Sequence, residues 1–216
     1  RLISEQQAFS TAPVDFREGL LYHALSDQCN DEAAARLALN NYQRAFAESG
    51  SDTEPQTLNN MMVNYILIAH KLGRLSSVRK MWGKYEKLLG KEKTANYEFS
   101  KLLLEGLTAQ TRGQYRKALQ SYRCIFDVLP FRPDKYRNIT LVYRFMAFCY
   151  AEMNHYPQAI TMMERALALA DKGGMKDAQI EIYKILATYY GHAGQKQKST
   201  SCLSRGVAIS DSLLNY

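Results

Sequence analysis

Long apolar runs are absent from this 216-residue sequence. A membrane-spanning helix needs roughly 18 or more consecutive apolar residues, and no run here approaches that length. We therefore expect no transmembrane segment among these residues. The chain opens at Arg1 rather than Met, so we expect a processed or trimmed N-terminus, with any signal peptide or anchor lying outside this sequence.

Cysteine and histidine are few and scattered. The cysteines form no Cys-x-x-Cys pair and no metal-ligand spacing: Cys29, Cys124, Cys149 and Cys202. We expect free or buried thiols, with Cys149 on the inner face of its helix, because small disulfide scaffolds are cysteine-dense and this chain is not. The histidines show no His-x-x-x-His pattern: His23, His70, His155 and His192. We predict no metal site and no cofactor.

Motifs of common enzyme classes are missing as well. Gly173 and Gly174 interrupt a helix and do not form the phosphate-binding pattern G-x-x-x-x-G-K. Neither a nucleophile elbow nor a pair of catalytic carboxylates is evident. The sequence therefore predicts a protein that is not an enzyme.

Two amphipathic helices stand out between Tyr143 and Leu169. Apolar or small residues recur there with helical spacing, first as Tyr143, Met146, Ala147 and Tyr150, then as Ala159, Ile160, Met163, Ala166 and Leu167. Asn154 suits the intervening turn because Asn tolerates a left-handed backbone, and Pro157 is accepted in a first helical turn. Such a pair cannot bury both of its faces alone, so we expect copies of it.

Copies do occur, with a period near 40 residues. The turn residues Gly73, Gly113, Asn154 and Gly194 are 40, 41 and 40 residues apart, and the first-helix residues Ile66, Gly106, Ala147 and Ala187 keep the same register. A weaker first pair has Asp31 as N-cap and Gly50 as C-terminal cap. Its first helix carries an apolar face of Leu20, Leu21, Tyr22 and Leu25.

We therefore predict an all-α fold of about five antiparallel helix pairs, in which the Tyr and Met stripes fill the core. We expect one repeat domain over residues 1–216. It would comprise a lead-in at 1–13 and pairs at approximately 14–50, 57–90, 95–130, 138–172 and 176–214, with Pro130 ending a helix.

The sequence resembles the tetratricopeptide repeat family. One copy shows Tyr143, Met146, Ala147, Tyr150, Tyr156, Ala159, Met163 and Ala166; another shows Leu102, Gly106, Gly113, Tyr115, Ala118, Tyr122 and Pro130. The match covers roughly 58–209, but the period is about 40 rather than 34 residues, so the helices are longer. The resemblance implies a right-handed superhelix. It also implies a concave groove, lined by the first helix of every pair, that binds a protein or peptide. Positions of the family's Lys/Asn clamp for a carboxylate carry Val63 and Leu67, which argues against that specific activity.

The repeat register, with this resemblance, assigns residues to the groove. They are Asn64, Leu67, His70 and Lys71 from the second pair, Leu107 and Gln110 from the third, Arg144, Phe148 and Glu152 from the fourth, and Lys184, Thr188 and His192 from the fifth. An exposed apolar stripe of Leu67, Leu107 and Phe148 would point to a partner. The alternative is that Leu107 and Phe148 pack against a neighbouring helix.

Positive charge is concentrated in the middle of the chain. Residues 71–144 hold 17 basic and 6 acidic side chains, a balance of +11, so the remainder carries −4 of the total +7. The cluster lies mostly on turns and second helices: Lys71, Arg74, Arg79, Lys80, Lys84, Lys87, Arg112, Arg116, Lys117 and Arg123. It is either a solvated face or a docking surface for an acidic protein or an anionic membrane. Nucleic acid is disfavoured because the aromatic residues are used in the core.

A second resemblance concerns context. The 40-residue period, the Tyr-rich helices and the ending Ser210-Asp211-Ser212-Leu213-Leu214 resemble the extracytoplasmic repeat portion of membrane-anchored regulators of the Bacteroides type. That resemblance implies a periplasmic sensing or docking segment of a larger signalling protein. The alternatives are a stand-alone adaptor for an acidic partner and a nucleic-acid-binding protein. We also expect an apolar C-terminal face at Leu203, Val207, Leu213 and Leu214, covered by a further helix or by self-association.

Overall fold

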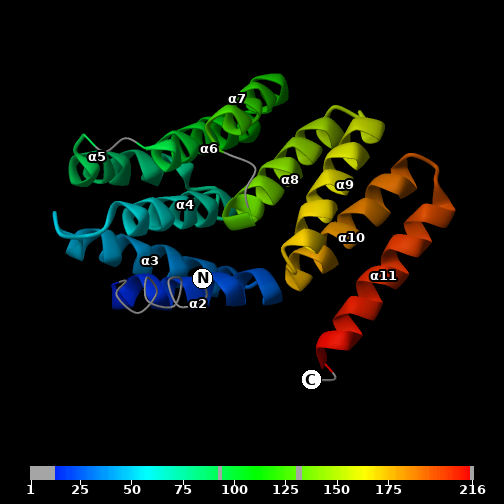
Figure 1. Cartoon of the computed structure of the whole chain (residues 1–216), viewed down its shortest axis with the longest axis horizontal. Coiled ribbons are helices and arrows are strands. Elements are labelled where there is room, and N and C mark those ends of the chain that lie inside the picture. The colour runs from blue at the N-terminus through cyan, green and yellow to red at the C-terminus, as the bar shows by residue number, and fades with distance from the viewer. Residues whose placement is uncertain (1–12, 92–93, 130–132, 215–216) are drawn as a thin grey trace. The chain divides into compact units, whose positions relative to one another are not determined.

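The computed structural model describes residues 13–91, 94–129 and 133–214. Within these ranges the chain forms ten α-helices, two short 3₁₀ turns and no strand (Figure 1). The α-helices are α2 (Val14–Cys29), α3 (Glu32–Glu48), α4 (Pro55–Lys71), α5 (Val78–Leu89), α6 (Ala95–Thr111), α7 (Tyr115–Val128), α8 (Tyr136–Glu152), α9 (Tyr156–Lys172), α10 (Lys176–His192) and α11 (Lys196–Leu214). The 3₁₀ turns are η1 (Leu75–Ser77) and η2 (Pro133–Lys135). The all-α prediction with about five antiparallel helix pairs is confirmed.

The chain divides into two compact units, residues 1–100 and 101–216, with the boundary inside α6. The single domain and the right-handed superhelix expected from the sequence both concern how these units are arranged, and they stay predictions. Residues 1–12 of the lead-in expected at 1–13, and the helix end expected at Pro130, lie outside the described residues.

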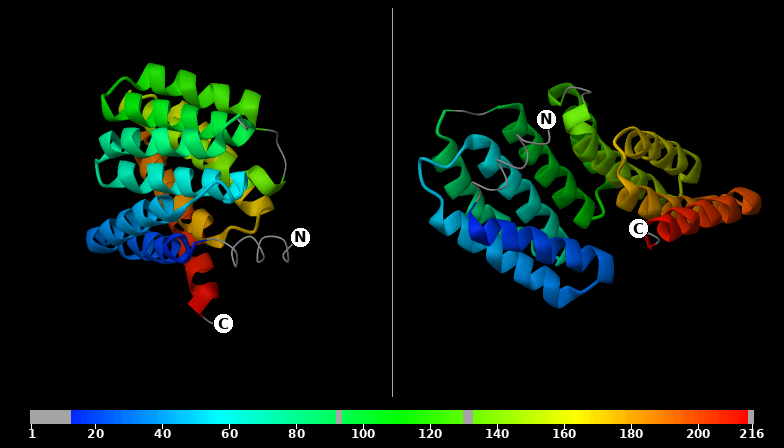
Figure 2. Two further views of the ribbon diagram at one scale, coloured as in Figure 1. Left: turned by 90° about the vertical axis from the view of Figure 1, so that its left-hand side faces the viewer. Right: turned by 60° about the horizontal axis from the view of Figure 1, so that its bottom comes forward.

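In the first unit, α2 packs on α3, α3 on α4, and α4 on α5 (Figure 2). Its core contains fully buried aromatic side chains, among them Tyr42, Phe46 and Tyr65. The predicted apolar face of α2 is wrong, because Leu21 and Leu25 are 69% and 44% exposed. Helix α2 instead turns Phe16 and Gly19 inward. A Cβ on Gly19 would lie 2.5 Å from the Tyr42 ring, so the lack of a side chain there lets the two helices approach closely.

Helix α3 begins as predicted and ends differently. The Asp31 carboxylate accepts hydrogen bonds from the backbone N–H groups of Ala33 (2.8 Å) and Ala34 (3.3 Å), as an N-cap does. The predicted cap at Gly50 is wrong: α3 ends at Glu48 with Ser49 as its C-cap, and Gly50 is not among the described glycines with a positive φ angle. The Ser49 hydroxyl and backbone N–H both donate to the Ala45 carbonyl, which satisfies one of the last free acceptors of the helix.

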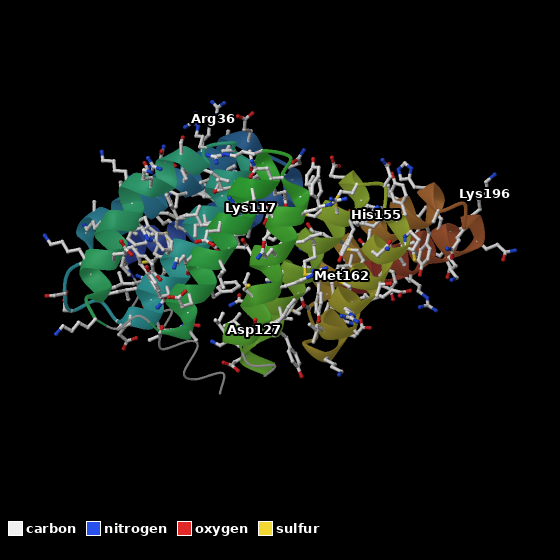
Figure 3. All side chains as sticks on the ribbon, turned by 90° about the horizontal axis from the view of Figure 1, so that it is seen from above. Arg36, Lys117, Asp127, His155, Met162 and Lys196 are labelled. Atoms are coloured by element: carbon white, nitrogen blue, oxygen red, sulfur yellow. The ribbon has the colours of Figure 1, made fainter. Side chains whose placement is uncertain are left out.

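In the second unit, α7 packs on α8, α8 on α9, α9 on α10, and α10 on α11. Buried residues with helical spacing supply the core, including Tyr122, Ala147, Met163 and Ile182. The prediction that Tyr and Met side chains fill the core is confirmed for most of them, with Tyr42, Tyr65 and Met62 buried in the first unit and Tyr122, Met146 and Met163 in the second. Tyr150 is only half-buried. Charged side chains such as Arg36 and Lys196 point outward (Figure 3).

The turns between the paired helices recur with the predicted period of about 40 residues. Gly73, Gly113, Asn154 and Gly194 all have positive φ angles, between 59° and 74°. Glycine reaches this left-handed region without steric cost, and Asn is one of the few other residues that enters it readily. Pro157 lies in the first turn of α9, also as predicted.

All four cysteines are free thiols, and Cys149 is buried as expected. On α11, Leu203, Val207 and Leu213 are exposed, which confirms the apolar C-terminal face for these three; the side chain of Leu214 is outside the described residues. None of the described helices is long and apolar enough to cross a bilayer.

Candidate functional site

Helix α8 presents one face to its core and another to the surface. Tyr143, Met146 and Ala147 are buried, whereas Arg144 is half-buried and Phe148 and Glu152 are exposed. Residues four apart lie one above the other on a helix. Arg144, Phe148 and Glu152 therefore form a single stripe that alternates charge, aromatic ring and charge.

One end of this stripe forms an ion pair with α10. The Arg144 guanidinium donates to the Glu181 carboxylate over 2.5 Å, and the two side chains are 28% and 46% exposed. The ion pair holds Arg144 in place while leaving part of both groups in contact with solvent. An ion pair of this exposure contributes little stability, so its main effect is to orient the two side chains.

Phe148 is the least expected residue on this face. Its side chain is 39% exposed, and its ring meets the Tyr115 ring edge-on with centroids 6.4 Å apart. The Tyr115 hydroxyl donates to the Glu152 carboxylate over 3.1 Å, and this bond raises the pKa of Tyr115. Tyr115 at the start of α7 thus packs against both Phe148 and Glu152 and fixes their positions.

Helix α10 repeats the arrangement with different side chains. Its exposed residues are Lys184, Thr188 and His192, again four apart. Tyr156, at the start of α9, stacks flat on the His192 ring, with a centroid distance of 4.9 Å and an interplanar angle of 12°. Tyr156 also lies 6.3 Å from the Tyr189 ring, and burial raises the pKa of Tyr189 to about 12.

We call the residues Arg144, Phe148, Glu152, Lys184, Thr188 and His192 the α8–α10 surface. Its chemistry is that of a binding surface: an exposed ring, cations and carboxylates, with hydroxyl groups beside them. Lys184 is exposed and forms no ion pair within the described part of the chain. Across the described residues, no group of three His, Cys, Asp or Glu side chains could hold a metal ion.

Two of the residues assigned to the groove are core residues instead. Leu107 is fully buried, and Gln110 is 7% exposed. The side-chain oxygen of Gln110 accepts hydrogen bonds from the Tyr122 hydroxyl (2.9 Å) and the Cys149 thiol (3.6 Å), which explains why a polar residue is tolerated there. The exposed stripe predicted through Leu67, Leu107 and Phe148 is therefore wrong at Leu107, whereas Phe148 is exposed.

The α4 residues assigned to the groove lie in the first unit. Asn64, Leu67 and His70 are half-buried. Lys71 is ion-paired with Asp27 of α2 over 2.8 Å and donates to the Ser26 carbonyl, so it links α4 to α2. Burial lowers the pKa of His70.

The tyrosines beside the α8–α10 surface were expected to serve only in packing, and their link to this surface was not predicted. Tyr115 and Tyr156 each begin the second helix of a pair and are 41 residues apart. The structure shows that each reaches the first helix of the following pair. Their shared position in the repeat was the available signal.

Comparison with known proteins identifies the type of fold. No protein-family model and no curated protein matches the chain. Among solved structures it is similar to BtubC (BKLC) from P. vanneervenii, with 21% identity and a TM-score of 0.51 over 99% of this chain and 91% of that chain. It is also similar to a variant of Podosopora anserina putative kinesin light chain TPR-like repeats, with 14% identity and a TM-score of 0.51 over 90% of this chain and 95% of that one.

A third similar structure is a Rap protein complexed with Competence and Sporulation Factor, with 12% identity and a TM-score of 0.61. The match covers 93% of this chain but only 55% of the Rap protein. Together these likenesses show a tetratricopeptide-like repeat fold.

Proposed function

We propose that the protein is a non-catalytic scaffold that binds a protein or peptide segment on the α8–α10 surface. The observation that carries this proposal is Phe148, a large apolar ring left 39% exposed between charged side chains. Binding energy at interfaces is concentrated in a few aromatic and arginine residues that become buried on contact. Phe148 and Arg144 are residues of that kind.

The side chains around Phe148 indicate which ligand suits the surface. An apolar side chain of the ligand would cover Phe148, and a carboxylate would pair with Lys184, whose charge is exposed. Arg144 is already shared with Glu181 and would orient the ligand through its remaining donors. The similar Rap protein, whose structure contains Competence and Sporulation Factor, supports the idea that a fold of this type can hold such a partner.

The proposal extends to context. We take the chain to be the sensing or docking segment of a larger, extracytoplasmic regulatory protein, as the second family resemblance implies. Self-association through Leu203, Val207 and Leu213 of α11 fits the same role, because it would cover their exposed apolar surface. An alternative is an adaptor for an acidic partner, and the exposed basic residues of α5 favour it.

Selection of peptides from a random library on the intact chain tests the proposed function. The affinity of the selected peptides is then measured by fluorescence anisotropy for the double variant Arg144→Glu/Phe148→Ala. We expect a loss of at least about tenfold, because the substitutions remove a ring that binding would bury and a complementary charge.

The matched control is Lys117→Glu/Leu37→Ala. It makes one charge reversal and one apolar truncation at exposed positions of α7 and α3. This control should bind like the unmodified chain. Peptides that bind the double variant with unchanged affinity would show that the α8–α10 surface is not the binding site. Duplex DNA binding with a steep salt dependence would favour a nucleic-acid function instead.

A further inference from the structure

Gly83 lies near the middle of α5, on its exposed side. A Cβ atom added there would meet no atom within 4 Å. Glycine is one of the least favourable residues for a helix interior. Two other helical glycines have a reason within the chain, because a Cβ would lie 2.5 Å from the Tyr42 ring at Gly19 and 2.3 Å from the Tyr122 ring at Gly106, whereas Gly191 and Gly206 leave room for ordinary contacts. Nothing in the described structure accounts for Gly83 in this way.

Three cations surround Gly83 on the helix surface. Arg79, Lys80 and Lys87 lie four before, three before and four after it, which are the neighbouring positions on a helix. All three are exposed, and none of them has a carboxylate partner among the residues that the structure describes. The fourth neighbour, Glu86, accepts a hydrogen bond from the Tyr97 hydroxyl of α6. We call Arg79, Lys80, Gly83 and Lys87 the Gly83 face.

Lys84, a further cation of α5, has a hydrogen-bond partner within the fold. Its ammonium group donates to the Ala47 carbonyl over 2.8 Å, near the C-terminal end of α3. Cations are stabilising at that end of a helix. Lys84 is therefore used within the fold, and the charges of the Gly83 face are left available to another molecule.

We propose that the Gly83 face docks an acidic helix of a partner protein. The bare backbone at Gly83 lets the partner's helix approach closely, since the distance between packed helices depends on the side chains at the contact. Carboxylates on that helix pair with Arg79, Lys80 and Lys87. This docking uses none of the residues of the α8–α10 surface.

Nucleic acid and membrane fit this face less well. Single-stranded nucleic acid needs exposed rings for base stacking. The aromatic residues beside α5 are instead packed on one another: Trp82 lies 5.2 Å from the Tyr85 ring and 5.7 Å from the Tyr97 ring. A membrane-surface helix places large apolar side chains next to its cations. None of the large exposed apolar residues of the described chain comes from α5.

The test uses a helical peptide of about 20 residues as the probe. Glutamates at i, i+4 positions flank a stripe of alanines, and a second peptide carries glutamine in place of glutamate. Calorimetry at low salt with the intact chain should show binding of the glutamate peptide only. Lys80→Glu/Lys87→Glu should weaken it at least about tenfold. Gly83→Leu, which changes no charge, should weaken it at least about fivefold.

Matched variants on α7 separate docking from diffuse attraction. Arg116→Glu/Lys117→Glu makes the same charge change, and Gln120→Leu adds a leucine between exposed residues of α7. Neither should change the affinity more than about twofold. Gly83→Ala should raise the unfolding midpoint by about 2–4 °C while weakening binding, which excludes misfolding as the cause.

Three results would overturn the proposal. The first is full affinity in Gly83→Leu, and the second is an equal loss in the α7 charge variant. The third is tighter binding of duplex DNA, or of vesicles containing phosphatidylserine, than of the glutamate peptide.

Discussion

Gly106 and Tyr122 show how a single residue fixes the distance between paired helices. A Cβ on Gly106 would lie 2.3 Å from the Tyr122 ring. That ring is fully buried, and its hydroxyl donates to Gln110, so it has no room to move aside. Burial also raises the pKa of Tyr122, which keeps the hydroxyl protonated as a donor. The glycine is therefore part of the packing.

Gly106→Ala should destabilise the protein by about 1–3 kcal/mol, because overpacking outweighs the gain in helix propensity of about 1 kcal/mol. Gly83→Ala has open space around the new methyl group and should have the opposite sign. Urea unfolding followed by circular dichroism measures both free energies. If both substitutions stabilise the protein, the tight contact between Gly106 and Tyr122 is not a feature of the folded state.

At the scale of helices, α2, α3 and α4 meet around His23. Its ring nitrogen Nδ1 lies 3.1 Å from the Tyr42 hydroxyl of α3, and Nε2 lies 3.9 Å from Asp27. Lys71 of α4 pairs with the same Asp27. Burial lowers the pKa of His23, the nearby Lys71 lowers it further, and Asp27 acts in the opposite direction.

The pKa of His23 is lower in the folded chain than in the unfolded chain, where it has the ordinary value of about 6.5. As the pH falls below that value, the unfolded chain therefore binds a proton at His23 more readily than the folded chain does. His23 therefore supports folding above that pH, and its contribution is lost as the pH falls through the folded-state value. Trp82, the only tryptophan, reports on the first unit. Unfolding followed by its fluorescence should show a smaller loss of stability between pH 7 and pH 5 in His23→Gln than in the unmodified chain. Identical losses would show that His23 is not buried as described.

The helices themselves could be predicted where periodicity and turn chemistry agree. Asp31, Asn154 and Pro157 have the roles that their chemistry suggested. The buried face of α2 was predicted wrongly, because its leucines suggested an apolar stripe, whereas Gly19 packs against the Tyr42 ring. Such a contact between distant residues leaves no local pattern in the sequence.

At the scale of the whole molecule, the 40-residue period was sufficient to predict the repeat fold. The site was only partly predictable, because a surface residue and a core residue can differ by one helical position. Leu107 and Phe148 were placed on the same stripe, yet Leu107 is buried and Phe148 is exposed. The ion pair of Arg144 with Glu181 and the stacking of Tyr156 on His192 join different repeats, so no single repeat reveals them.

Backbone amide chemical shifts of the intact, isotope-labelled chain, measured during titration with a library-selected peptide, locate the residues that bind the peptide. If a peptide or protein segment binds the α8–α10 surface, the largest shifts fall on Arg144, Phe148, Lys184 and His192. They should disappear in Arg144→Glu/Phe148→Ala and persist in Lys117→Glu/Leu37→Ala. Shifts confined to the exposed sides of α9 and α11, with these four residues unchanged, would show that the peptide binds elsewhere.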